Sequence, residues 1–282
     1  MHRLRVFVCS NTHWDREWHT PFSVFQMRLL QLFDQLTALL LRDPAYRCYN
    51  FDGQTIVLED FLDFRPEMAD TLRALVAQGR ITVGPWYVLP DEFIAGDEAL
   101  VRNLLLGTQQ AGAFGACSRT GYLPDMFGHI AQMPQLLRGF GIDNAILWRG
   151  ISDATLPNEF VWQAPDGSRV LTHRINERVG YGIGWFGQWP IHSALGVKLD
   201  PAVFKQPAAK AEWFVKLVEH IAATATTDVV YYPHGTDHTL PDPETSAWLQ
   251  IARTLRPAWE IQHASFDECM AALRAATRAA TL

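Results

Sequence analysis

The sequence has few cysteines and no cysteine motif typical of a metal or redox site. Its four cysteines, Cys9, Cys48, Cys117 and Cys269, lie far apart and form no CxxC pair. Cys9 and Cys48 sit in apolar, strand-like runs, where a reduced thiol behaves as a small hydrophobic side chain. We therefore expect a protein of a reducing compartment.

Long apolar runs and basic clusters are also missing. No stretch reaches the roughly 20 apolar residues of a membrane-spanning helix, and the N-terminal apolar run leads directly into a His/Asp cluster, unlike a cleavable signal peptide. The net charge is -6, with no Lys/Arg cluster interleaved with aromatics, which argues against nucleic acid. We expect a soluble, cytoplasmic protein that binds neither membrane nor nucleic acid. Homo-oligomer formation stays open.

What is present is an alternation of short β-branched or aromatic runs with longer amphipathic stretches. With 282 residues, 48% of them hydrophobic, one large domain can bury its own core. We expect strands at 4–10, 46–51, 80–83, 120–123, 144–148, 169–173, 228–232 and 259–263. We expect helices at 22–41, 55–78, 97–114, 208–223 and 270–282. This α/β pattern fits seven or eight units of a (β/α) barrel, and a doubly wound open sheet would give the same alternation.

Two further segments differ from this pattern. Segment 152–207 is rich in Gly and Pro, contains several Trp and Tyr, and is predicted to be a long loop on the active-site face. The C-terminal Ala-rich helix lacks a glycine cap, which we interpret as a fragment boundary.

Polar residues follow several predicted strands, where parallel barrels carry their catalytic groups. His13 and Asp15 are an i, i+2 pair after the first strand, so both can offer ligand atoms to a divalent ion. The alternative is a pair that caps the next helix. Trp14 and Trp18 flank the pair, and indole rings beside carboxylates suit a sugar, although aromatic residues also fill cores.

Two more aspartates follow later strands. Asp125 comes after a strand between a proline and an apolar pair, where an unpaired carboxylate is costly unless it meets a cation or does chemistry. It could instead cap a helix over 126–140. Asp237 lies on a glycine-containing loop, where a hydrogen-bonded structural role is the alternative. His234 and His238 are four apart, but in a loop this spacing loses its helical meaning as a metal pair.

Five sequence blocks together resemble glycoside hydrolase family 38, in its bacterial type. They are 11–18 (NTHWDREW), 52–54 with 58–60, 84–93 (GPWYVLPDEF), 124–129 (PDMFGH), and 148–150 followed by 160–168. The similarity runs from about residue 8 to residue 240. The five blocks are specific for the family only when taken together in this order and spacing, since no single block would be specific.

The resemblance implies a retaining exo-α-mannosidase whose N-terminal catalytic domain is a (β/α)7 barrel with parallel strands, within a larger multidomain enzyme. It implies one divalent metal ion, usually zinc, bound by His13, Asp15 and Asp125. Asp125 would also be the nucleophile and Asp237 the general acid/base, two carboxyls that a retaining enzyme holds about 5 Å apart. The residues expected to contact the α-mannoside are Trp14, Trp18, Trp86, Asp91 and His238.

Two features depart from the family pattern. Position 234 is His, where an amide residue is more usual. The fourth metal ligand of the family lies beyond residue 282, and the C-terminal helical and β-sandwich domains are absent from the chain. We therefore expect the chain alone to bind metal weakly, with water, His238 or another chain at the open position.

Three alternatives remain open. The first is a mannosylglycerate hydrolase of the same family. The second is a metal-dependent polysaccharide deacetylase that uses His234 and His238 as ligands and a metal-bound water as nucleophile. The third is an inactive carbohydrate-binding fragment, which would bind sugar without turnover.

Overall fold

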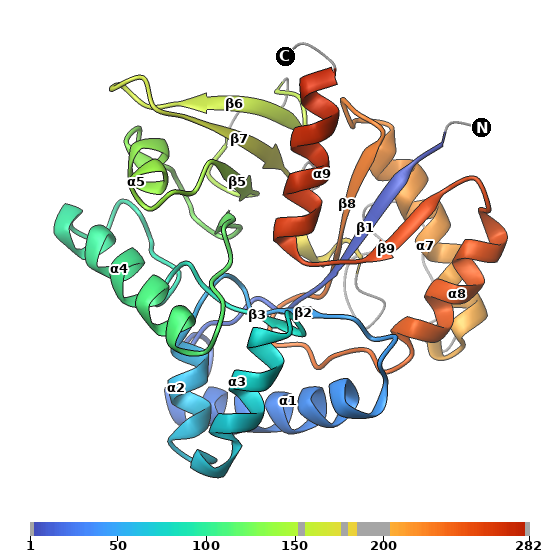
Figure 1. The fold of residues 1–282 in the computed structure, drawn as a ribbon, viewed down its shortest axis with the longest axis horizontal. Coiled ribbons are helices and arrows are strands. Elements are labelled where there is room, and N and C mark those ends of the chain that lie inside the picture. Colours follow the sequence, from blue (N-terminus) through green and yellow to red (C-terminus); the bar gives the residue numbers. More distant parts are fainter. Residues whose placement is uncertain (1–2, 152–155, 176–179, 185–203, 280–282) are drawn as a thin grey trace.

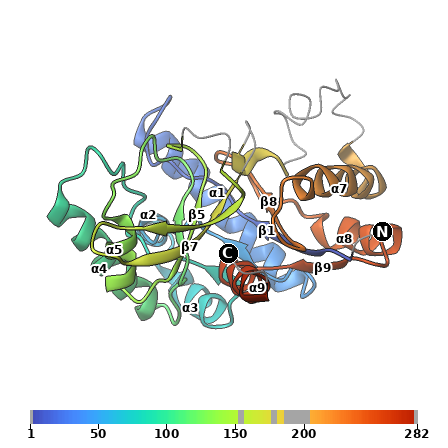
Figure 2. The same cartoon turned by 90° about the horizontal axis from the view of Figure 1, so that it is seen from above.

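A computed structural model describes residues 3–151, 156–175, 180–184 and 204–279. β1 (Arg5–Ser10), β8 (Val229–His234) and β9 (Glu260–His263) lie among helices, whereas β6 (Glu159–Gln163) and β7 (Arg169–Arg174) lie along one edge of the molecule (Figure 1). Figure 2 shows α7 and α8 packed beside β1 and β8, with α9 on another side of the same strands. The architecture is therefore a mixed α/β domain.

The strands pair in three separate groups. β1 (Arg5–Ser10) lies between β8 (Val229–His234) and β9 (Glu260–His263), all parallel. β2 (Tyr49–Asn50) pairs in parallel with β3 (Ile81–Thr82). The third sheet has the order β4 (Gly121–Leu123), β5 (Asn144–Leu147), β7 (Arg169–Arg174) and β6 (Glu159–Gln163).

The predicted closed barrel is confirmed only in part. Its parallel strands are present, and single bridges, Asn11 to Asn50 and Gln54 to Trp86, extend the pairing between neighbours. Among the described residues, however, the hydrogen-bonded strands do not close into one ring, and β6 runs antiparallel to β7. The strand ends nevertheless lie at one edge, where the candidate site forms.

Four predicted helices occur close to their expected positions. They are α1 (Phe22–Arg42), α4 (Asp97–Ala113), α7 (Pro207–Ala222) and α9 (Phe266–Ala279). α8 (Thr245–Leu255) was not predicted, and α5 (Met133–Gly139) occupies only the second half of the 126–140 helix considered as an alternative for Asp125. The single helix predicted over 55–78 is instead divided into α2 (Ile56–Leu62), a 3-10 turn (Pro66–Met68) and α3 (Ala69–Ala77). Pro66 explains the division, since proline disfavours a helical residue before it and cannot donate a helical hydrogen bond. No helix of the described residues is long and apolar enough to cross a membrane.

The prediction of one long loop over 152–207 was wrong for part of that segment. β6 and β7 form an antiparallel hairpin there, followed by a 3-10 turn at Gly180–Gly182. β6 alternates between partly or fully buried and exposed positions, a period of two that the glycines and prolines around it obscure. The rest of the segment lies partly outside the described residues.

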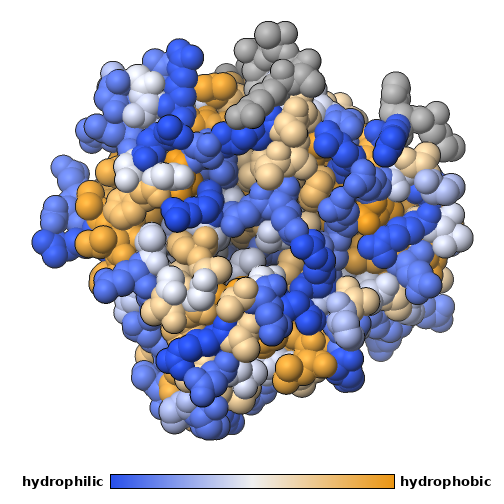
Figure 3. All heavy atoms as spheres, viewed as in Figure 1, coloured by the Kyte–Doolittle hydropathy of each residue, from blue (hydrophilic) through white to orange (hydrophobic). Residues whose placement is uncertain are grey.

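The core packs on both faces of β1. Val6 and Val8 contact the cluster beneath α7 and α8, whereas Phe7 and Cys9 face the cluster that includes α9. This alternation makes β1 a central strand, so that its C-terminal end is held firmly. The face shown in Figure 3 is largely hydrophilic, with apolar side chains gathered toward its left edge, on the α4 and α5 side.

Candidate functional site

The candidate site begins where β1 and β8 end. Their parallel pairing continues beyond both strands, with Asn11 N–H donating to the His234 carbonyl at 3.1 Å and His13 bridging to Asp237. Gly235 makes this possible, because a Cβ at this position would lie 1.8 Å from the Asn11 carbonyl oxygen. The two backbone segments thus bring His13 and Asp237 side by side.

His13 is the centre of a cluster of carboxylates. Its side chain is 5% exposed, and its Nδ1 lies 2.8 Å from Asp52 Oδ2. Its Nε2 lies 3.4 Å from Asp15 Oδ1 and 3.5 Å from Asp125 Oδ2. Burial alone would lower the pKa of this imidazole, but Asp52, Asp125 and Asp15 outweigh it and raise the pKa well above its ordinary value. The structure therefore brings together the three residues that were predicted as metal ligands.

Asp52 orients the His13 ring, a role that was not predicted. It is fully buried, adopts a left-handed backbone (φ 50°), and accepts hydrogen bonds from Trp14 N–H and Gln54 Nε2, each at 2.9 Å. Burial raises its pKa, an effect that His13 offsets in part. With Asp52 on Nδ1, the Nε2 atom of His13 faces the other two carboxylates. The Asp52-Gly53-Gln54 block was the only signal of this role in the sequence.

His238 supports Asp15 rather than facing an opening. Its side chain is 6% exposed, and its Nε2 accepts the Asp15 N–H at 3.1 Å and lies 3.3 Å from Asp15 Oδ2. Trp14 and Phe25 pack against the ring. Burial would raise the pKa of Asp15, but the nearby imidazoles of His13 and His238 outweigh it and lower the pKa. The structure therefore shows a supporting contact of His238 with Asp15, and the contact of His238 with the sugar stays a prediction.

Asp125 is held by an arginine from the loop after β5. Arg149 Nε lies 2.5 Å from Asp125 Oδ1, and the guanidinium packs over the rings of Trp148 and Phe127. The alternative in which Asp125 caps a helix is wrong, since α5 begins at Met133, eight residues later. Its two carboxylate oxygens thus face different partners, Arg149 on one side and His13 on the other.

Tyr181 lies near the two predicted catalytic aspartates. It lies in the segment predicted to reach the active-site face, is 3% exposed, and packs against the His13 ring at 5.1 Å between ring centroids, with the two planes tilted by 30°. Burial raises its pKa, and the carboxylates of Asp237 and Asp125 raise it further. Both carboxylates therefore lie close to this one hydroxyl. Its sequence context, a glycine-rich segment, gave no signal for this particular residue.

The side chains of two of the predicted sugar contacts lie in the core. Trp86 is fully buried and donates from Nε1 to the Tyr122 carbonyl at 3.0 Å, and Trp14 is only 3% exposed. Trp18, by contrast, is 66% exposed beside His238. Asp91 is exposed on the loop after β3, and the hydrogen bonds and ion pairs of the described residues do not connect it to the His13 cluster.

His234 points away from the cluster, which weakens the deacetylase alternative. It is 2% exposed, contacts Ser10 Oγ through Nδ1 at 3.2 Å, and packs against Trp248. Burial lowers its pKa to about 4. His234 and His238 therefore do not form the metal pair that the deacetylase reading requires.

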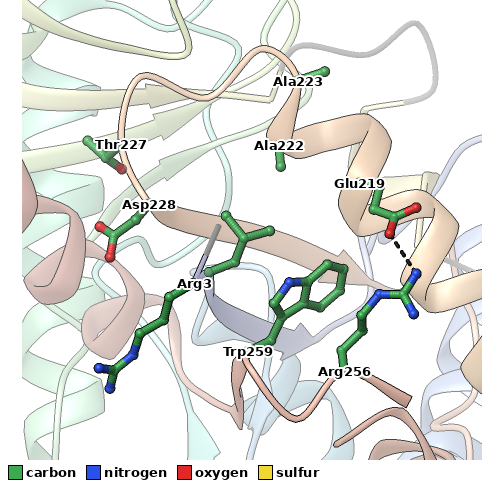
Figure 4. A pocket seen from close by; sticks show the side chains of 9 residues that line it. Arg3, Glu219, Ala222, Ala223, Thr227, Asp228, Arg256 and Trp259 are labelled. Atoms are coloured by element: carbon green, nitrogen blue, oxygen red, sulfur yellow. Dashed lines mark hydrogen bonds and ion pairs between the residues drawn. The ribbon is translucent and has the colours of Figure 1, made fainter. Parts of the chain in front are cut away.

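A cavity of about 550 Å³ lies at the opposite end of the strands, lined by Arg3, Trp259 and neighbouring residues (Figure 4). Its charged groups already have partners, since Arg256 pairs with Glu219 at 2.7 Å and Asp228 pairs with Arg5. We assign the candidate site to the His13 cluster, because the cavity lacks a comparable convergence of groups among its described residues.

Comparison with known proteins decides the family. The model of the glycosyl hydrolases family 38 N-terminal domain matches residues 3–281. The chain belongs to this family. It is 33% identical over 280 residues to the "Putative mannosylglycerate hydrolase" of Halalkalibacterium halodurans, which covers 95% of the chain and 29% of that protein.

Other relatives agree with this membership. The chain is 31% identical over 177 residues to the alpha-mannosidase of Saccharomyces cerevisiae, covering 60% of the chain and 16% of that protein. The crystal structure of an alpha-mannosidase from Enterococcus faecalis V583 superimposes with a TM-score of 0.86 at 28% identity, covering 97% of this chain and 29% of that one. The chain thus spans less than a third of the length of these relatives.

Proposed function

We propose that this family 38 chain is the catalytic domain of a retaining exo-α-mannosidase, the N-terminal part of a multidomain enzyme whose strands complete a (β/α)7 barrel. The single observation that carries the proposal is the convergence of His13, Asp15 and Asp125 beside Asp237. These residues come from three different strand ends, and the carboxylates of Asp15 and Asp125 both face the buried Nε2 of His13. A cytoplasmic location belongs to the proposal and is supported by four free cysteines.

The donor set fits a divalent metal ion, which we propose to be zinc. His13 Nε2 is buried and makes no hydrogen bond to a described residue, although two carboxylates face it. Around tetrahedral zinc with bonds of about 2.0–2.1 Å, neighbouring ligand atoms lie about 3.3 Å apart, close to the separations from His13. No group of three or more His, Cys, Asp or Glu side chains in the described residues is arranged as a ready-made metal site, so a small adjustment would accompany binding. When bound, the metal supplies positive charge for the mannose hydroxyls and for developing charge.

Two carboxylates perform the displacement in this proposal. Asp125 attacks the anomeric carbon, and Asp237 protonates the departing glycosidic oxygen, so that mannose becomes linked to Asp125 as an ester. Asp237, now a carboxylate, then removes a proton from water, which releases mannose with its configuration retained. Arg149 keeps Asp125 oriented, and Tyr181 lies near Asp237. Trp18 provides an exposed ring for the sugar face.

A mannosylglycerate hydrolase is the second candidate for the same site. It is favoured by the 33% identity to the Halalkalibacterium protein across almost the whole chain. Both candidates use the same two carboxylates, and they differ only in the group attached to the mannose.

The test compares two substrates on the zinc-loaded chain and on any longer gene product that contains it. An activated aryl α-mannoside and 2-O-mannosylglycerate are assayed with wild type, Asp125→Ala and Asp237→Ala, with Asp228→Ala at the opposite end as a matched control. Asp125→Ala should abolish turnover of both substrates. Asp237→Ala should lower turnover of 2-O-mannosylglycerate far more than turnover of the aryl α-mannoside, because the aryl group departs without needing a proton. Turnover that survives Asp125→Ala, or acetate release in place of mannose, would overturn the proposal.

A further inference from the structure

A buried ion pair joins the loops after β3 and β4, outside the cluster of His13. Glu92 and His129 side chains are 0% and 7% exposed, with Glu92 Oε1 2.7 Å from His129 Nδ1. The second carboxylate oxygen accepts the Ile130 N–H at 2.8 Å. Burying a charged pair is expensive unless its hydrogen bonds are complete, so this pair has a structural or functional reason to exist.

The partners of His129 fix where its protons lie. Its Nε2 is 2.9 Å from the Arg149 carbonyl oxygen, which can only accept, so Nε2 must donate. Its Nδ1 faces the Glu92 carboxylate, which also accepts. Both ring nitrogens therefore have a partner, and His129 connects the loop after β3 to the turn at Arg149.

His129 fastens the turn that contains Arg149. The Arg149 carbonyl accepts from His129, and the Arg149 N–H donates to the Pro124 carbonyl at 3.2 Å. The next residue, Gly150, has φ 77°, and a Cβ there would lie 2.7 Å from the Gly128 nitrogen. The turn is thus pressed against the loop that carries Asp125, and its backbone is bonded on both sides.

The position of the Arg149 turn determines where its guanidinium contacts Asp125. Nε approaches Asp125 Oδ1 at 2.5 Å, which leaves Oδ2 facing His13 Nε2 at 3.5 Å. Rotation of the Arg149 turn would move the guanidinium and release the first oxygen. The orientation of Asp125 depends in this way on the hydrogen bond between His129 and the Arg149 carbonyl, although His129 does not contact Asp125 itself.

We propose that Glu92 and His129 are positioning residues that hold the Arg149 turn, and through it Asp125, in the reactive orientation. The inference rests on the proposed function in one respect, namely that Asp125 is the nucleophile. Neither residue touches the reacting atoms. Their loss should lower kcat, because the chemical step depends on the Asp125 orientation, and should leave KM within about twofold.

The first test is kinetic and has a matched control within the chain. Glu159 and His173 form a second buried pair with the same geometry, 2.9 Å between Oε1 and Nδ1, on the β6–β7 hairpin. Glu92→Gln and His129→Leu should lower kcat about 10- to 100-fold, the range expected when a catalytic group is misplaced by up to about 1 Å. Glu159→Gln should leave kcat within about threefold. His129→Gln, whose Nε2 amide can still donate to the Arg149 carbonyl, should recover most of the kcat lost in His129→Leu.

The second test does not require activity. The ¹⁵N-detected Nε2–H group of His129 should be protected from hydrogen exchange in wild type, because it donates to the Arg149 carbonyl, and should lose protection in Glu92→Gln. An unprotected Nε2–H in wild type would overturn the assigned hydrogen bond. Equal kcat values for Glu92→Gln and wild type in an active enzyme, or a failure of His129→Gln to recover kcat, would overturn the positioning role. If wild type turns over no mannoside, the proposed function fails while the ¹⁵N result still stands by itself.

Discussion

Replacing Asp52 by asparagine tests whether the His13 cluster is built for a metal. The Asp52 carboxylate lies 2.8 Å from His13 Nδ1 and is held by Trp14 N–H and Gln54. Asparagine keeps the size and the two hydrogen bonds but removes the negative charge that keeps the proton on Nδ1 and makes Nε2 a stronger ligand. Loss of such a supporting carboxylate typically weakens metal affinity about 10- to 100-fold, or about 1.4–2.8 kcal/mol.

The assay is competition for Zn²⁺ against a chromophoric chelator, with the free energy of unfolding measured in parallel. Asp60→Asn is the matched control, because Asp60 is equally buried and pairs with Arg16 rather than with His13. Asp52→Asn should weaken zinc binding by at least tenfold, and Asp60→Asn by less than twofold. Equal zinc affinity in wild type and Asp52→Asn, or an equal loss in both variants, would refute the reasoning.

Three stability predictions follow from other contacts. Lys210→Met should destabilise the fold by about 3–5 kcal/mol at pH 7, because it leaves Asp242 buried without its 2.8 Å partner. The pKa of Asp242 is lowered in the fold, so its stabilisation exists above the unfolded pKa and disappears as pH falls; urea titrations should show the difference shrinking below about pH 4. Gly235→Ala should cost about 1–3 kcal/mol in urea denaturation and lower activity, because its Cβ would displace Asn11. Trp86→Phe should cost about 1–3 kcal/mol, because the buried Tyr122 carbonyl loses the hydrogen bond from Trp86, and KM should not change. A raised KM would instead show that Trp86 contacts the sugar.

The sequence predicts the strands well because buried parallel strands are short, apolar and flanked by turn residues. β1, β5 and β8 lie within two residues of their expected bounds. β6 was missed, since an edge strand with one partly exposed face resembles a loop. Ring closure could not be predicted at all, because hydrogen bonding between distant strands leaves no local pattern in the residues.

The candidate site also has residues that a local sequence pattern predicts and residues whose contacts it does not predict. His13, Asp15 and Asp125 could be placed because each follows a predicted strand, and parallel strand ends meet at one edge. Arg149 and Tyr181 could not be assigned their contacts, because their partners lie far away in the sequence. The burial of Trp14 and Trp86 could not be predicted, because an indole beside a polar motif suits both a sugar platform and a core.

The central claim is that Asp125 is the nucleophile of a retaining mannosidase, and covalent trapping tests it most directly. The active protein is incubated with a fluorinated, activated mannosyl donor that slows hydrolysis of the glycosyl ester, and the adduct is located by mass spectrometry of peptides. Our account predicts one mannosyl adduct on Asp125 and none in Asp125→Ala. An adduct on another residue, or turnover with inverted configuration and no adduct, would contradict it.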